Sequence, residues 1–119
     1  MNPQEIKSRT DTLVDACMKV ARLIPQGDQL SELTRMELIR RASDLGVLGK
    51  SLSQPQVVRY FGERLNKSVD HVNGCSFWLE RIRAEKWLDD AIIASLIEEC
   101  GNLAKIYTLS VKNVEGKLD

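Results

Sequence analysis

Apolar residues recur at steps of three and four along nearly the whole chain, and runs of strict apolar–polar alternation are missing. A period near 3.6 residues is typical of amphipathic helices, whereas alternation would indicate half-buried strands. Pro25 and Gly27, Pro55, and the pair Asp89 and Asp90 interrupt the pattern and divide it into four segments. We therefore predict four helices, over about residues 3–24, 30–51, 55–85 and 89–114.

Each predicted helix has one face on which the repeating residues gather, and these four faces should form the core. In the first helix we expect burial of Ile6, Leu13, Cys17, Val20, Ala21 and Ile24. In the second we expect burial of Ser31, Thr34, Leu38, Ala42, Leu45, Gly49 and Leu52. In the third we expect burial of Val58, Phe61, Leu65, Val69, Val72, Ser76, Leu79 and Ile82. In the fourth we expect burial of Ile92, Ile93, Leu96, Cys100, Leu103, Tyr107, Ser110 and Val114.

Short connections between such helices predict a single all-α domain, an antiparallel up-down-up-down four-helix bundle over residues 1–119. Pro55 fits the first turn of the third helix, with Ser53 or Gln54 as its cap. Asp89 or Asp90 should cap the fourth helix, ahead of which residues 86–88 turn the chain. A frayed, charged tail should follow residue 114.

The charge balance excludes a chain that is basic throughout. Lys and Arg together number 17, and Asp and Glu number 17, so no net field attracts the whole molecule to RNA or to an acidic membrane. Residues 35–88 nevertheless carry 10 basic and 6 acidic side chains, and residues 89–119 carry 3 and 6. We interpret this mainly as complementary charge between neighbouring helices, and secondly as a weak basic face.

Cysteine usage and hydropathy predict a soluble, cytoplasmic protein. Cys17, Cys75 and Cys100 lie far apart, with no CxxC pair, so neither a zinc site nor a redox dithiol is indicated. Three reduced core thiols suit a cytoplasm. No stretch approaches the roughly 18 apolar residues of a membrane span, and the first ten residues lack the features of a signal peptide. We expect no metal, no cofactor and no membrane partner.

Several segments together resemble a known family. They are Ile24-Pro25, Leu33-Thr34, the block IRRAS at residues 39–43, the segment SQPQVVRYF and the last long stretch LIEECGNLAKIYTLSVKN. This layout resembles the small four-helix-bundle proteins encoded within intervening sequences of bacterial 23S ribosomal RNA genes. Where that family usually continues with a segment resembling Ile-Pro and then Asn-Ile-Ala-Glu-Gly, this chain has DLGVLGKS at residues 44–51.

The resemblance covers nearly the whole chain and implies a closed homo-oligomer, with a pentameric ring favoured. It also implies an association with ribosomal RNA. The accessory variability proteins of diversity-generating retroelements resemble the same architecture and bind RNA together with a reverse transcriptase.

One row of side chains on the predicted third helix combines aromatic rings with cations. At helical spacing the row lies beside the apolar face and consists of Tyr60, Arg64, Lys67, His71 and Trp78. Aromatic and basic residues of this kind are enriched at subunit interfaces, and they can also stack on unpaired bases and neutralise phosphates. We favour the interface, because the net charge is zero.

The arginines of the second helix raise the same question. With Leu38 inward, Arg40 points outward and Arg35 and Arg41 lie on opposite shoulders, where solvation and an ion pair of Glu37 with Arg41 are expected. An RNA site would require a larger patch of phosphate contacts, with the members Arg35, Arg40, Arg41, Lys50, Arg81, Arg83 and Lys86.

An enzymatic alternative rests on Arg64 and His71, which are two helical turns apart. The segment RLNKSVDH resembles the catalytic signature of the all-helical HEPN ribonucleases, in which the histidine acts as acid or base and the arginine stabilises phosphate charge. An arginine and a histidine seven residues apart also occur often by chance, and the one histidine of this chain must lie somewhere. We therefore predict a non-enzymatic homo-oligomer that associates with RNA as a secondary property, with a metal-independent ribonuclease or an adaptor protein without RNA binding as alternatives.

Overall fold

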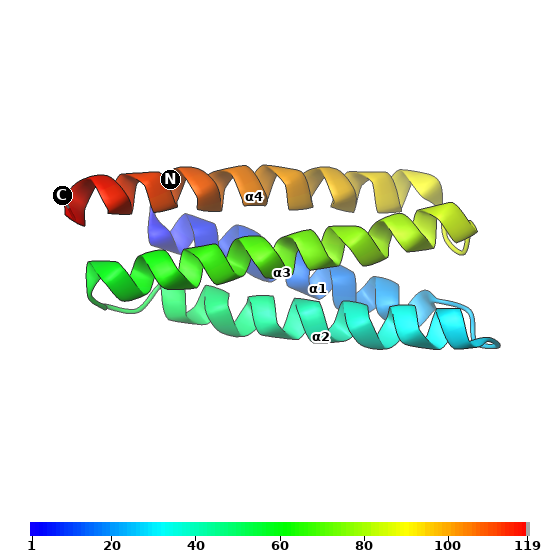
Figure 1. Ribbon diagram of the computed structural model, residues 1–119. Helices are drawn as coiled ribbons and strands as arrows, with labels where there is room; N and C mark the ends of the chain where they lie inside the picture. The colour runs from blue at the N-terminus through cyan, green and yellow to red at the C-terminus, as the bar shows by residue number, and fades with distance from the viewer. Residues whose placement is uncertain (119) are drawn as a thin grey trace.

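The computed structural model describes residues 1–118, apart from the side chains of residues 115, 117 and 118. It contains four helices, α1 (Pro3–Leu23), α2 (Gln29–Leu52), α3 (Val58–Glu85) and α4 (Asp90–Leu118), and the described residues form no strand. Successive helices run in opposite directions along one long axis (Figure 1). The predicted all-α four-helix bundle is confirmed.

Each helix packs beside the helices that precede and follow it in the sequence. Contacts join α1 to α2, α2 to α3 and α3 to α4, and a less extensive contact between α4 and α1 closes the bundle. The molecule measures 51 × 21 × 20 Å. Its length follows from the rise of about 1.5 Å per residue in helices of up to 29 residues.

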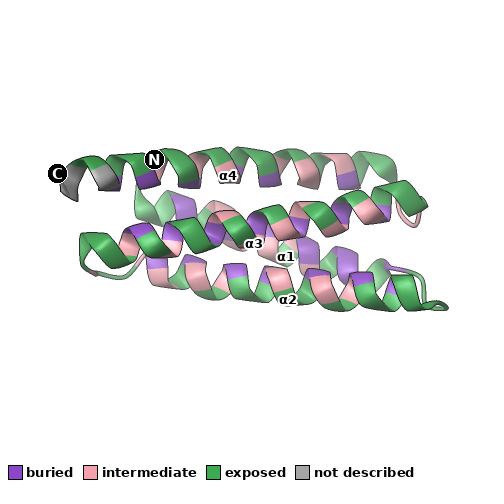
Figure 2. Cartoon of the chain, in the orientation of Figure 1, coloured by how far each residue is buried: buried purple, intermediate pink, exposed green. Residues whose placement is uncertain are grey.

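Buried residues form a continuous inner stripe on every helix (Figure 2). Every residue predicted for the buried faces of the first two helices is buried, and Thr10 joins them. This agreement is expected because an α-helix between two neighbours can turn only one stripe of its surface inward. The core therefore lies along the axis of the bundle and is lined by all four helices.

The buried stripe of α3 differs from the prediction. Small residues occupy it between the leucines, and the complete stripe is Gly62, Leu65, Ser68, Val72, Cys75, Leu79 and Ile82. Four residues predicted for the core are at its margin instead: Val58 is exposed, and Phe61, Val69 and Ser76 are half-buried. The reason is close packing, since a Cβ at Gly62 would lie only 3.1 Å from Cγ1 of Val114 on α4.

The stripe of α4 is also displaced slightly. Ile92 is exposed, Leu96 and Ser110 are half-buried, and Val111 is buried although we did not predict it. The helix continues to Leu118, so the frayed tail predicted after Val114 is wrong over the described residues; residue 119 lies outside them.

The predicted start of α3 is wrong by three residues. Pro55 lies in the connection, and Val57 precedes the helix without a side-chain cap. The side-chain amide of Gln56 donates to the carbonyl oxygens of Ser51, at 2.8 Å, and of Gln54, at 3.2 Å. These local bonds to the backbone compete with a helical first turn, and the helix therefore begins later.

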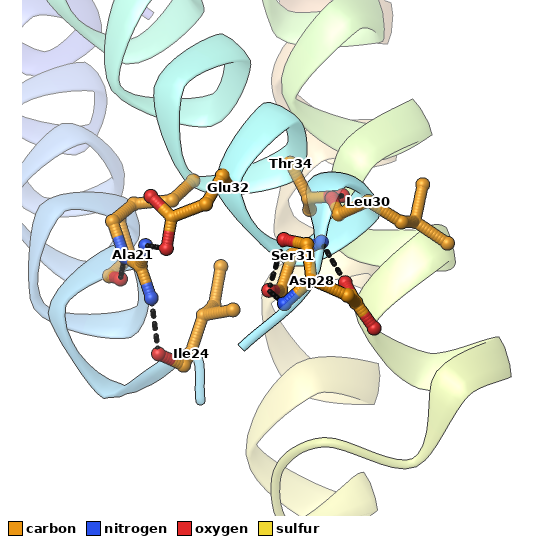
Figure 3. A network of polar contacts seen from close by, with 8 residues as sticks. Ala21, Ile24, Asp28, Leu30, Ser31, Glu32 and Thr34 are labelled. Atoms are coloured by element: carbon orange, nitrogen blue, oxygen red, sulfur yellow. Dashed lines mark hydrogen bonds and ion pairs between the residues drawn. The ribbon is translucent and has the colours of Figure 1, made fainter. Parts of the chain in front are cut away.

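Three other helix ends follow ordinary capping chemistry. Asp28 begins α2, where its Oδ1 accepts the Ser31 N–H at 2.8 Å (Figure 3). Asp89 begins α4 as predicted, since its Oδ1 accepts the Ala91 N–H at 2.8 Å. Lys86 ends α3 in the left-handed region, with φ of 56°.

Candidate functional site

Arg35 is engaged in holding two helices together. It projects from α2, and its Nε and Nη2 donate to the carbonyl oxygens of Ala21, at 3.2 Å, and Ile24, at 2.5 Å. Its Nη1 donates to Glu32 at 2.7 Å. Figure 3 shows these two carbonyl groups beside the start of α2. The last carbonyls of a helix lack partners within that helix, so Arg35 satisfies the end of α1.

Three further arginines of the predicted phosphate patch are paired with carboxylates. The N···O distances are 2.6 Å from Arg40 to Glu37, 3.4 Å from Arg81 to Glu85 and 2.9 Å from Arg83 to Asp90, respectively. The expected ion pair of Glu37 with Arg41 is wrong, because Glu37 binds the arginine three residues later instead of four. Lys50 and Lys86 are exposed, and neither has an ion pair with a described side chain.

The aromatic and cationic row of α3 does not lie on one uniform surface. Tyr60 and Lys67 are exposed, whereas Arg64, His71 and Trp78 are half-buried. One of its members contacts the segment that precedes α3, and another contacts α2. Arg64 donates to the side-chain oxygen of Gln56, and His71 contacts Arg41. This edge of α3 therefore faces α2 and its connecting segment.

Arg41 and His71 meet between α2 and α3. The Arg41 Nη1 lies 3.4 Å from His71 Nδ1. Because a guanidinium can only donate, the histidine nitrogen is the acceptor in this contact. The stem of Arg41 lies against Gly74, where a Cβ would come within 2.7 Å of the Arg41 Cδ. Arg41 Nε is buried and, among the described side chains, is the one buried nitrogen or oxygen atom without a hydrogen-bond partner.

Arg64 and His71, the residues of the hypothetical catalytic pair, each contact a different partner. The two residues occupy the same side of α3, but the hydrogen bonds of the structure engage Arg64 with Gln56 and His71 with Arg41. No described hydrogen bond joins them to each other. A ribonuclease mechanism remains an untested hypothesis.

Exposed apolar side chains form the second notable surface. On α2, Leu33, Met36 and Val47 are 48%, 67% and 71% exposed, and all three lie on the side opposite the buried stripe. On α3, Phe77 is exposed and packs edge-to-face against Trp78, with ring centroids 4.9 Å apart. Trp78 belongs to the predicted aromatic and cationic row, whereas the exposure of the other four residues was not predicted. The sequence contained a signal for this surface, because several apolar residues at outward positions of one amphipathic helix are an uncommon pattern.

The buried ionisable groups of the core are poor reactants. Cys17, Cys75 and Cys100 are free and buried. The pKa of Cys17 is raised mainly by a hydrogen bond with Cys75 and secondly by burial. Burial raises the pKa of Cys100 to about 12. A thiol that stays protonated is a weak nucleophile. The described residues contain no cluster of three His, Cys, Asp or Glu side chains suited to a metal ion.

A cavity at the α2–α3 connection has a volume of about 430 Å³ and is lined by Pro3, Leu52, Ser53, Gln54, Pro55, Gln56, Val58, Phe61 and Val114. None of these side chains ionises, so the cavity offers no acid or base. Over the described residues, no helix combines the length and apolar character that crossing a membrane requires.

No protein-family model matches the chain, and no similar protein is found among curated proteins or solved structures. Function is therefore inferred from the residues of this chain and from the family that its sequence resembles.

Proposed function

We propose that the protein is a non-enzymatic four-helix bundle that assembles with copies of itself through the outer faces of α2 and α3. The exposed apolar residues Leu33, Met36 and Val47 carry this proposal. Apolar surface of this kind gains free energy when it is removed from water. A copy of the same chain is the partner that is always present at the same concentration.

The aromatic residues of α3 extend this surface. Tyr60 and Phe77 are both more than half exposed, and Trp78 is half-buried beside Phe77. Tyr and Trp supply large contact areas at subunit interfaces with little loss of side-chain freedom. The resemblance to the intervening-sequence family supports a closed ring, and five subunits is the number that we propose.

The ion pairs of the outer surface favour a protein interface over a general RNA-binding face. Four of the seven cations proposed for phosphate contact, Arg35, Arg40, Arg81 and Arg83, already bind carboxylates of their own chain. A phosphate would have to replace each carboxylate. RNA association is accordingly a secondary property in this proposal, and we propose the cytoplasm as the location because three free cysteines suit a reducing compartment.

Native mass spectrometry of protein purified without nuclease treatment tests the assembly. We expect a ring mass, and we expect the double variant Met36→Glu with Val47→Glu to shift the distribution to monomers. The reason is that two carboxylates would be desolvated in each subunit contact. The same spectra reveal any bound RNA by its additional mass.

A matched double variant controls for added charge. Ser8 and Thr108 are exposed on α1 and α4, away from the proposed interface, so replacing both by Glu should leave the ring mass unchanged. A wild-type monomer at micromolar concentration would contradict the proposal and favour an adaptor for a different protein. Equal dissociation of both double variants would place the interface elsewhere.

A further inference from the structure

The Arg41 side chain is held in a defined place between two helices. It leaves α2 and lies against α3 at Gly74. A Cβ added at Gly74 would be only 2.7 Å from the Arg41 Cδ and 2.8 Å from its Nε. A glycine inside a helix is unfavourable unless the space or the backbone freedom is used. Here the missing Cβ provides the space in which the stem of Arg41 packs.

The guanidinium of Arg41 lacks the acceptors that such a group normally has. Its Nε is buried without a hydrogen-bond partner. The carboxylate four residues earlier, Glu37, binds Arg40 instead. None of the ion pairs between described side chains includes Arg41. A partly buried cation without an ion-pair partner is unfavourable. Because folding has already removed part of the water around the Arg41 guanidinium, an anion that binds it incurs less of the desolvation cost.

Two further donors belong to α3. In the contact with Arg41 the His71 Nδ1 is the acceptor, which leaves Nε2 as the ring nitrogen that can donate. Lys67 precedes His71 by one helical turn, is exposed, and has no ion pair with a described side chain. The contact of Arg41 with His71 thus joins donors from α2 and α3, and Lys67 is one helical turn away on the same side of α3.

We propose that Arg41 and His71, assisted by Lys67, bind a phosphate group at the surface where α2 and α3 meet. The planar guanidinium can present two parallel N–H groups to two phosphate oxygens, while the ring and the ammonium approach from the other helix. The phosphate belongs either to a small ion or phosphomonoester, or to the backbone of an RNA strand. Lys67 and His71 lie in the row between Tyr60 and Trp78, so the site borders the surface proposed for self-association, but it uses none of the apolar residues that carry that proposal.

Titration of sodium phosphate into the full-length protein tests the site, with the single histidine as the probe. With ¹³C-labelled histidine, the ring signals of His71 should shift and saturate, and sodium chloride at the same ionic strength should produce no saturating shift. The Arg41→Gln variant should bind phosphate at least about tenfold more weakly, because charge-assisted bonds are lost. Arg59→Gln, which removes an exposed charge from the first turn of α3, should match the wild type.

A second variant protects the test against simple misfolding. Gly74→Ala improves helix propensity while its Cβ displaces Arg41, so it should fold and still lose the phosphate response. The absence of a saturating shift in the wild type, or wild-type affinity in both Arg41→Gln and Gly74→Ala, would overturn the proposal. The phosphate response is read from the His71 signals and the assembly from the subunit mass, so failure of one proposal is distinguished from failure of the other.

The source of the phosphate is decided by competition. A single-stranded oligouridylate is added to the phosphate-saturated protein, and the His71 signals are followed. Displacement of phosphate at micromolar RNA supports the site as a contact for an RNA backbone. Retention of the phosphate-bound signals supports a site for a free phosphate or phosphomonoester.

Discussion

Arg35 binds the end of α1 although it belongs to α2. Two of its nitrogens satisfy the carbonyl oxygens of Ala21 and Ile24, and its side chain is only 18% exposed. Arg40, five residues later, has a side chain that is 62% exposed and binds only Glu37. The two arginines therefore contribute differently to the stability of the fold, because Arg35 is shielded from water and Arg40 is not.

Replacing Arg35 by Ala should lower the free energy of unfolding by about 1–2 kcal/mol, because bonds from a charged donor to two carbonyls are lost. Arg40→Ala is the matched control and should cost less than about 0.5 kcal/mol, as expected for an exposed ion pair. Urea unfolding followed by circular dichroism measures both. Equal losses in the two variants would contradict the distinction.

The contact between α1 and α2 depends on small residues. Gly46 and Gly49 both face α1: a Cβ at Gly46 would be 3.5 Å from Val14 Cγ1, and one at Gly49 would be 3.0 Å from Thr10 Cγ2. The threonine cannot easily move, because its hydroxyl bonds to the Ile6 carbonyl oxygen at 2.7 Å. The two helices therefore approach each other closely at this level.

Two glycine substitutions should have opposite effects on stability. Gly49→Ala should lower the free energy of unfolding by about 1–3 kcal/mol, because its methyl group overpacks against Thr10. Gly101→Ala on α4 should raise it by about 0.5–1 kcal/mol, since helix propensity improves and nothing lies within 4 Å of the new Cβ. Thermal and urea unfolding compare them. A stabilised Gly49→Ala protein would show that α1 and α2 can separate at little cost.

At the scale of the whole molecule, α1 and α4 make the least extensive contact of the bundle, and polar groups span it. Arg9 donates to Glu99 through Nε at 3.2 Å and Nη2 at 2.5 Å, and this pair raises the pKa of Arg9. Deeper in the same contact, the hydroxyl of Tyr107 lies 2.5 Å from Thr10 Oγ1. Tyr107 is fully buried, and burial raises its pKa to about 12.

These buried groups predict that the bundle loses stability in alkali. Tyr107 in the unfolded chain ionises near its ordinary pKa of 10.0, whereas in the folded protein it stays protonated to about pH 12. The raised pKa contributes stability that is complete below pH 10 and is lost as the pH rises toward 12. The loss is about 1.4 kcal/mol per pH unit for such a group. Burial raises the pKa of Cys100 from 9.0 to about 12, which begins the decline one unit earlier.

Tyr107→Phe separates the tyrosine from the thiols. The variant is expected to be less stable near neutral pH, because the hydrogen bond with Thr10 is lost, but its stability should fall less steeply between pH 10 and 12. Urea midpoints at several pH values, with reductant present, measure the slopes. Parallel curves for the two proteins would mean that Tyr107 ionises without opening the core.

The amino-acid sequence by itself determined the number of the helices, their approximate extent and most of their inner faces. The stripe of α2, from Ser31 to Leu52, could be predicted completely because helical periodicity is local and depends only on spacing along the chain. The start of α3 could not be predicted, because it depends on a hydrogen bond from the Gln56 side chain to the end of α2. This bond keeps Pro55 in the connection, whereas we expected Pro55 in the first turn of the helix.

Only the tertiary structure decided which charged residues have partners. Glu37 could reach Arg40 or Arg41 from the sequence, and the packing of α3 against α2 draws Arg41 to Gly74 and His71 and leaves Arg40 with the carboxylate. It likewise turned Arg35 toward the end of α1. Such choices depend on how neighbouring helices are rotated and aligned, and that arrangement results from many weak contacts between residues far apart in the sequence.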